Sequence, residues 1–217
     1  MLTCCVVDIN VFIGACLGTG ASARVIAVCL QGQARPLMGA ALLAEYEDVL
    51  GQDPLFAGCR LSAHERSDRL DIFLATCEWT RLYFGWRPNL PDEADNHLVE
   101  LAVVGRAEFV VTRTLRDLTR VELVVSRPAL RQPGRLSATR ITAMSALIVR
   151  LPDDKHQRLR ALADSRGTTL NRLIDDMVTL MPAEFDAETR FKLRAARRAG
   201  QAERGLALLD KAAGQDD

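Results

Sequence analysis

Lysine is missing from the first 140 of the 217 residues, although arginine is frequent there. A Walker A loop needs a lysine next to its serine or threonine to reach the phosphates of a nucleotide. The absence therefore argues against a P-loop nucleotide-binding domain in this stretch. It also argues against phosphatase and receiver folds, which share a βα pattern but use a lysine beside their aspartates.

Long apolar runs are missing too. No window approaches the roughly 18 uninterrupted apolar residues of a membrane span, and no basic stretch precedes an apolar run as in a secretory signal. The six cysteines lie in the first 80 residues without Cys-x-x-Cys spacing, so we expect reduced, mostly buried thiols. Together these absences predict a cytoplasmic protein with no membrane partner.

A net charge is also absent, because 28 basic and 28 acidic residues balance. Neither half of the sequence is a polycation, so composition alone gives no support for nucleic-acid binding. Hydrophobic residues make up 48% and charged residues 26%, which is typical of a globular chain. The length predicts one domain joined to a smaller module.

Short apolar runs alternate with helical patterns along the first 130 residues. Val6 and Val7 end the first run before Asp8, as a buried parallel strand would. Ser62 and Glu65 have the spacing of a capping box at a helix start. Further strands are expected at 36–38, 109–111 and 123–125, and helices at 21–30, 40–50 and 92–104. The alternation predicts an α/β fold whose parallel sheet has helices on both faces.

Four acidic residues are placed along this pattern where chemistry could take place: Asp8, Glu45, Asp95 and Asp117. Groups that lie just past strand ends converge in one crevice of a doubly wound sheet. Carboxylates gathered there repel one another unless a cation neutralises them. Oxygen ligands suit Mg²⁺ or Mn²⁺, and such an ion can activate water for phosphoryl hydrolysis.

Each acid also has a purely structural explanation when taken alone. Asp8 could cap a helix or a turn, Glu45 could be an exposed helical residue, and Asp95 could favour a helix N-terminus. Asp117 could pair with a neighbouring arginine. Their joint occurrence, in order on alternating βα units, favours the metal site. The three histidines lack HExxH spacing and cysteine companions, which argues against zinc.

The segments that carry these acids resemble the PIN-domain ribonucleases, especially the toxin components of bacterial toxin–antitoxin pairs. The resemblance rests on residues 7–10, 43–47, 95–102 and 111–118, which read VDIN, LAEYE, DNHLVELA and VTRTLRDL. It implies RNA cleavage that depends on Mg²⁺ or Mn²⁺. The implied catalytic residues are Asp8, Glu45, Asp95 and Asp117; the implied metal ligands are Asp8, Asp95 and Asp117; the supporting residues are Asn10, Asp92, Asn96 and Thr112.

Two positions depart from the family pattern. Ile9 stands where the family usually has threonine, and Thr114 stands where it often has aspartate or asparagine. The change at residue 114 removes a group that could orient water or contact the metal sphere. Asp117 remains as the fourth carboxylate, so an active nuclease is still expected.

A second module follows a linker at residues 131–144. Residues 145–182 resemble a ribbon–helix–helix unit, in which strands of two chains pair into a ribbon that can enter the DNA major groove. A strand and two short helices bury little surface alone, so we expect this module to dimerise the chain. Arg150 is the only outward ribbon residue suited to base readout, which predicts weak DNA binding at most.

Residues 183–217 are expected to form a helical tail with charged faces. Antitoxins that resemble the second module commonly cover the toxin's site with such a tail, and a basic set here could contact the acidic pocket: Arg190, Lys192, Arg194, Arg197 and Arg198. A solvated helix of mixed charge is the alternative. The sequence thus predicts a nuclease in residues 1–130 that binds RNA and is restrained by the tail. A chain ending near residue 130 should therefore be more active than the full chain. The alternative function is a DNA-binding autoregulatory protein with an inactive or masked nuclease domain.

Overall fold

The computed structural model describes residues 3–18, 20–82, 96–112 and 151–214. The chain divides into two compact units, one formed by residues 1–123 together with 182–217, the other by residues 124–181. The first unit therefore joins the beginning of the sequence to its C-terminal tail.

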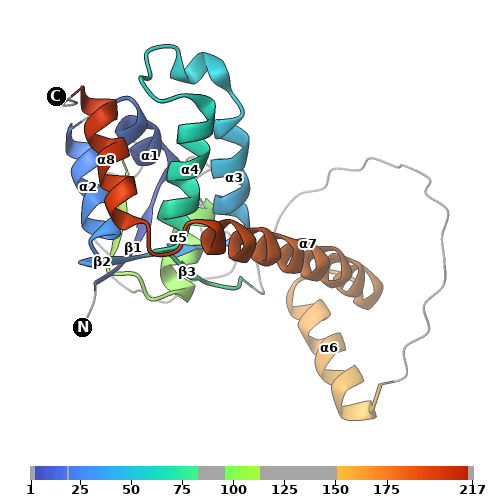
Figure 1. Ribbon diagram of the computed structural model, residues 1–217. Helices are drawn as coiled ribbons and strands as arrows, with labels where there is room; N and C mark the ends of the chain where they lie inside the picture. Colours follow the sequence, from blue (N-terminus) through green and yellow to red (C-terminus); the bar gives the residue numbers. More distant parts are fainter. Residues whose placement is uncertain (1–2, 19, 83–95, 113–150, 215–217) are drawn as a thin grey trace. The chain divides into compact units, whose positions relative to one another are not determined.

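A four-stranded parallel sheet lies at the centre of the first unit (Figure 1). Its strands are β1 (Thr3–Val7), β2 (Ala34–Met38), β3 (Glu78–Trp79) and β4 (Phe109–Val111), in the order β3-β2-β1-β4. Val6 of β1 is in register with Leu37 of β2 and with Val110 of β4. The sheet is flanked by helices, which confirms the predicted α/β class.

The helices of the first 112 residues follow the predicted pattern closely at two places. They are α1 (Ile9–Cys16), α2 (Gly20–Leu30), α3 (Ala40–Leu50), the 3₁₀ helix η1 (Asp53–Phe56), α4 (Ala63–Leu74) and α5 (Asn96–Val104). The bounds of α3 are those expected from periodicity. At the start of α4, Ser62 and Glu65 form the predicted capping box: the Ser62 amide donates to Glu65 Oε2 at 2.9 Å, and Ser62 Oγ accepts from the Glu65 amide at 3.2 Å.

Two elements differ from expectation. Residues 9–16 form a helix that was not among the expected ones, because Asp8 caps its first turn and Val11, Phe12 and Ala15 bury an apolar face. β3 has two residues, too few for any periodic signal. The strand expected at 123–125 and the start of the helix expected from residue 92 lie outside the described residues.

All six cysteines are free thiols, as expected, and three of them are buried. No single helix within the described ranges is long and apolar enough to cross a membrane. The pair α1 and α2 passes that test by length and composition, but its two halves are bent by 107°.

The second unit contains α6 (Asp153–Ser165) and the first part of α7 (Leu170–Arg197). Two helices were expected here, but α7 continues through Pro182 and so runs past the predicted end of the module at residue 182. Periodic apolar positions support the helix before the proline. Beyond it, an ion pair between residues one helical turn apart stabilises the helix, with Lys192 Nζ 2.6 Å from Glu188 Oε1. Residues 145–150 of the expected ribbon lie outside the described part of the chain.

The C-terminal tail completes the core of the first unit. Helix α8 (Ala202–Ala213) packs against α1, α2 and α4 (Figure 1). Phe191, Leu208 and Leu209 are buried in the same apolar cluster as the strands. A Cβ at Gly205 would lie 2.8 Å from a Leu30 side-chain atom and 2.9 Å from an Ile72 side-chain atom. Helix α8 therefore packs too closely against the core for a larger residue at this position.

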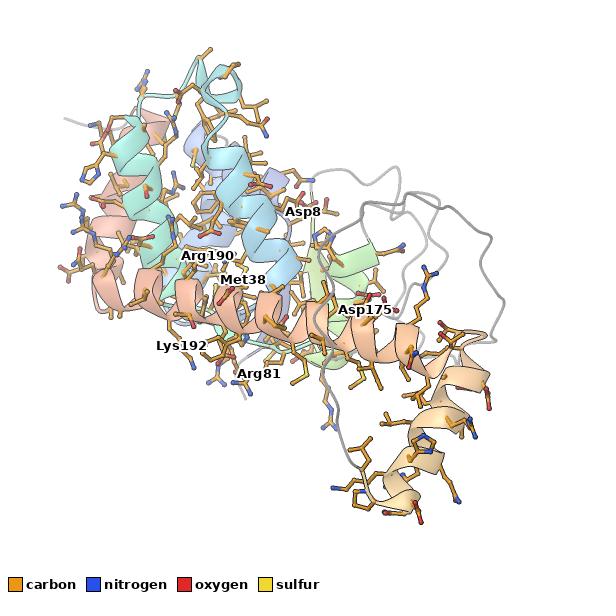
Figure 2. All side chains as sticks on the ribbon, turned by 90° about the vertical axis from the view of Figure 1, so that its right-hand side faces the viewer. Asp8, Met38, Arg81, Asp175, Arg190 and Lys192 are labelled. Carbon is orange, nitrogen blue, oxygen red and sulfur yellow. The ribbon has the colours of Figure 1, made fainter. Side chains whose placement is uncertain are left out.

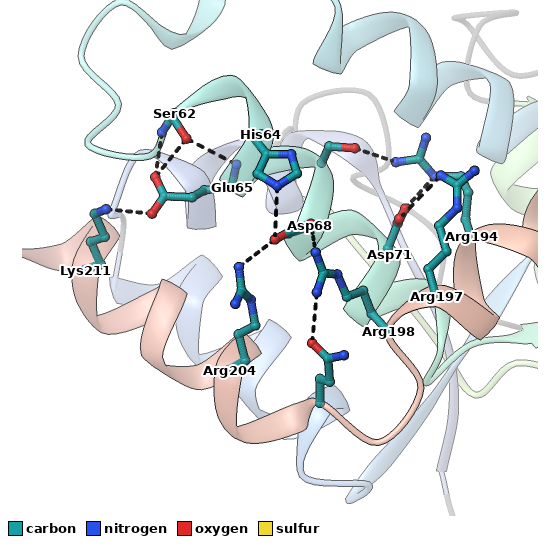
Figure 3. Close-up of polar contacts among 12 residues, drawn as sticks. Ser62, His64, Glu65, Asp68, Asp71, Arg194, Arg197, Arg198, Arg204 and Lys211 are labelled. Carbon is teal, nitrogen blue, oxygen red and sulfur yellow. Dashed lines mark hydrogen bonds and ion pairs between the residues drawn. The ribbon is translucent and has the colours of Figure 1, made fainter.

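Ion pairs between the tail and α4 surround this apolar contact (Figure 3). Asp68 is buried and accepts from Arg198 and Arg204, each at 2.6 Å. Burial alone would raise the pKa of Asp68, but the hydrogen bonds from the two arginines outweigh it and hold the pKa below its usual value. Two further pairs accompany it, Arg194 with Asp71 at 2.7 Å and Lys211 with Glu65 at 2.6 Å.

Candidate active site

Asp8 lies at the carboxyl end of β1, in the middle of the sheet edge where the strands end. Its amide donates to the Val111 carbonyl of β4 at 3.0 Å, which continues the pairing of the two strands by one residue. Its side chain caps α1 by accepting from the Asn10 amide at 3.2 Å. The predicted helix cap is therefore present, and the residue is 6% exposed.

Two neighbouring polar side chains fix one oxygen of the Asp8 carboxylate. Thr112, directly after β4, donates from Oγ1 to Asp8 Oδ2 at 2.6 Å. Asn10 Nδ2 donates to the same oxygen and also to Thr112 Oγ1, at 3.0 Å. The structure thus brings Asn10 and Thr112, both expected as supporting residues, to Asp8 from just past the ends of the neighbouring strands β1 and β4.

Glu45 is carried by α3, with its neighbour Tyr46 anchoring that helix to β1. The Tyr46 hydroxyl donates to the Val7 carbonyl at 2.9 Å in the interior, one residue before Asp8. The Glu45 carboxylate Oε2 lies 3.1 Å from Nε2 of His97 on α5. Sequence reasoning identified neither of these two roles, although both residues belong to the motif segments.

Burial and charge act on the Asp8 carboxyl in opposite directions. Removal from water raises its pKa and is the largest influence, while the hydrogen bonds from Thr112 and Asn10 lower it. The negative charge of Glu45 raises the pKa further, so the two carboxyl groups lie within electrostatic range of each other. The net effect is a raised pKa. A cation at this point would relieve the cost of the buried charge.

The donor atoms present suit a hard divalent cation. Asp8 and Glu45 offer carboxylate oxygens, which Mg²⁺ and Mn²⁺ prefer. Asn96, the residue before His97 on α5, has a buried amide oxygen without a hydrogen-bond partner among the described residues. In the ranges that the structure describes, no three or more His, Cys, Asp or Glu side chains form a metal-binding group. The predicted site residues Asp92, Asp95 and Asp117, with Thr114 and the predicted DNA contact Arg150, lie outside those ranges.

The basic side chains of the tail do not contact this site in the described part of the chain. Arg190 pairs with Glu47 of α3 at 3.1 Å, and Arg198 pairs with Asp68 of α4 at 2.6 Å. Lys192 pairs with Glu188 of its own helix. Arg194 pairs with both Asp71 and Glu47, and Arg197 also pairs with Asp71. Figure 2 shows Asp8 apart from Arg190 and Lys192. In place of the contact with the acidic pocket that the sequence suggested, these side chains pair with acids of α3, of α4 and of α7 itself.

Comparison with known proteins gives one family. A family model described as "PIN domain" matches residues 5–116. No curated protein and no solved structure matches the chain. The matched range includes Asp8, Glu45 and Thr112, the residues that form the geometry described above.

Proposed function

Because the chain belongs to the PIN-domain family, we propose that it is an endoribonuclease of toxin–antitoxin type that depends on Mg²⁺ or Mn²⁺. PIN domains are usually nucleases that need a divalent metal ion, and their substrate is nucleic acid. The choice of RNA, the toxin–antitoxin class and the fused antitoxin-like module extend this family assignment and rest on the motif segments and on the pattern of residues 145–182.

The observation that carries the proposal is the buried Asp8 carboxylate at the end of β1. Thr112 and Asn10 hold one of its oxygens, and Glu45 lies within electrostatic range. In the proposed site Asp8, Asp95 and Asp117 hold the ion, while Glu45 supplies a further carboxylate to the catalytic group. When bound, a divalent ion supplies an activated water and a positive charge opposite the developing phosphoryl charge.

We expect Asp8→Asn to lower the rate of RNA cleavage at least about 100-fold, because even residues that only support metal ligands commonly contribute 10–100-fold. The variant should also unfold at a higher temperature than the wild type without metal, because it no longer buries a charged carboxylate, whose pKa is raised by removal from water and by the charge of Glu45. Cleavage of mixed RNA with Mn²⁺ and thermal unfolding with and without Mn²⁺ measure both effects.

Asp48→Asn is the matched control for that variant, because Asp48 is an exposed acid on α3 outside the proposed site. It should keep wild-type activity. An equal rise of the melting temperature on adding Mn²⁺ to wild type and to Asp8→Asn would contradict a site at Asp8. Failure of the wild type to cleave RNA would favour the alternative, a DNA-binding regulator with an inactive or masked nuclease domain; Thr114 is the sequence feature that favours it.

We further propose that residues 145–182 chiefly dimerise the chain and bind DNA weakly at most, through Arg150. Large apolar side chains exposed on the part of α7 in the second unit support an association surface: Ile174, Val178, Leu180 and Met181. Light scattering at micromolar concentration should give the mass of a dimer, and a monomer would contradict this proposal. Footprinting at physiological salt should show no protected operator; protection that Arg150→Ala removes would show specific DNA recognition instead.

We propose that the tail restrains the nuclease through α3 rather than by filling the site. Support comes from the pair of Arg190 with Glu47, since Glu47 lies two residues after Glu45 on the same helix. The tail would then act on the orientation of the helix that carries a catalytic carboxylate.

A further inference from the structure

The residue that contacts Glu45 belongs to none of the predicted site sets. His97 lies on α5, and its Nε2 is 3.1 Å from Glu45 Oε2 on α3. The side chain of His97 is 19% exposed and that of Glu45 is 37% exposed. A glutamate with that much exposure keeps rotamer freedom unless a partner holds it, and His97 is such a partner.

The contact adds little to the packing of α5. Leu98, Leu101 and Ala102 are the buried apolar residues through which that helix joins the core. A partly exposed pair between an imidazole and a carboxylate contributes little to stability. The position of a catalytic carboxylate matters far more for rate, since a misplacement of about 1 Å can cost roughly 100-fold.

We propose that His97 is a positioning residue of the nuclease site, which holds the Glu45 carboxylate in one orientation within electrostatic range of Asp8. The inference rests on the proposed function. His97 acts through Glu45: with the proton on Nε2, the imidazole donates to Oε2 and leaves Oε1 without a bond to His97. Tyr46 fixes the backbone of α3 at the neighbouring residue, so His97 supplies the remaining restraint on the Glu45 side chain.

The test uses the full chain with His97→Leu and His97→Gln. His97→Leu should lower kcat for RNA cleavage about 10–100-fold, the range found when a residue that orients a neighbouring functional group by a hydrogen bond is lost, with little change in KM. Because the charge of Glu45 acts on Asp8, a displaced Glu45 carboxylate should also weaken the Mn²⁺ dependence of the melting temperature, while the melting temperature without metal changes little. His97→Gln should recover part of both effects, because its amide nitrogen can donate to the same carboxylate.

A double variant separates positioning from structure. If His97 acts only through Glu45, His97→Leu should change kcat no further in a Glu45→Gln chain. His156→Leu, on the exposed face of α6, is the matched control and should behave as wild type. A merely structural role would lower the melting temperature without metal and leave kcat and the Mn²⁺ response of the folded protein unchanged.

Each outcome decides the proposal. Wild-type kcat and Mn²⁺ response in His97→Leu, with an active wild type, overturn the role of His97 and leave the proposed function standing. If the wild type cleaves no RNA, the proposed function fails. The role of His97 is then decided by the Mn²⁺ shift of the melting temperature: an equal shift in wild type and His97→Leu, or no shift in either, overturns the positioning role. If His97→Leu does not fold, His97→Gln carries the same comparison: a Mn²⁺ shift below that of wild type supports the role and an equal one overturns it.

Discussion

A chain that ends at Met181 should fail to fold cooperatively. Such a truncation removes Phe191, Leu208 and Leu209, which lie buried in the same core cluster as the sheet. Truncating one buried leucine or phenylalanine to alanine commonly costs about 2–5 kcal/mol, and a domain's whole stability is about 5–15 kcal/mol. The lost burial is therefore of the same size as the total. Near-ultraviolet circular dichroism and a thermal unfolding scan measure the loss.

The exposed Leu193 gives the control for this truncation. It is 59% exposed on the same segment, so Leu193→Ala should unfold within a few degrees of the wild type. A cooperative transition of the truncated chain near the wild-type temperature would show that the tail is an appendage. In that case a chain ending near residue 130 should fold and be more active, as the sequence predicts, instead of failing to fold.

The double variant Arg198→Ala/Arg204→Ala should lose about 3 kcal/mol of unfolding free energy, the lower end for breaking a buried ion pair. The side chain of Asp68 is 5% exposed and keeps neither arginine partner in that variant. His64 Nε2 remains 3.8 Å away, but its own side chain is largely exposed. Urea unfolding at pH 7 measures the difference, and Arg197→Ala, a 65% exposed side chain, should change little.

The pH dependence of this loss follows from the lowered pKa of Asp68. A carboxyl group whose pKa is lower in the folded state stabilises the fold above its unfolded pKa of about 3.9, and this stabilisation disappears as the pH falls. The stability difference between wild type and double variant should therefore narrow below about pH 4. Adding Asp68→Asn should recover part of the loss at pH 7; no recovery would show that the unpaired charge is not the cause.

The elements that sequence predicted well are those with a local signal. The bounds of α3 follow from its apolar periodicity, and the start of α4 follows from Ser62 and Glu65 three residues apart. β3 depends on pairing of Trp79 with Met38 across the sheet, and no local pattern encodes a two-residue strand. Helix α1 was not predicted: it has eight residues, and nearly all of them are apolar or small and buried, so no polar face alternates with an apolar one.

The site was predictable where strand ends and motif spacing placed its residues. Asp8, Asn10 and Thr112 meet because β1 and β4 are neighbours that end at the same edge. The pair of Glu45 and His97 joins residues 52 positions apart on two helices, which requires the tertiary structure. The acids of α4 had a recognisable signal: Glu65 and Asp68 lie one turn apart on a helix face that turned out to be covered by the basic tail.

The packing of α8 against α1 and α2 has a consequence for the order of folding during synthesis. Helix α2 ends at Leu30 and α8 begins at Ala202, so the ribosome adds about 170 residues between them. At roughly 5–20 residues per second this takes on the order of 10–30 s. Every residue of the proposed site has by then been made, but the core that supports it lacks its last layer. The nascent chain therefore completes its core only after its own tail has been translated. Until then the apolar faces of α1 and α2 that α8 covers are exposed, and chaperones can bind them.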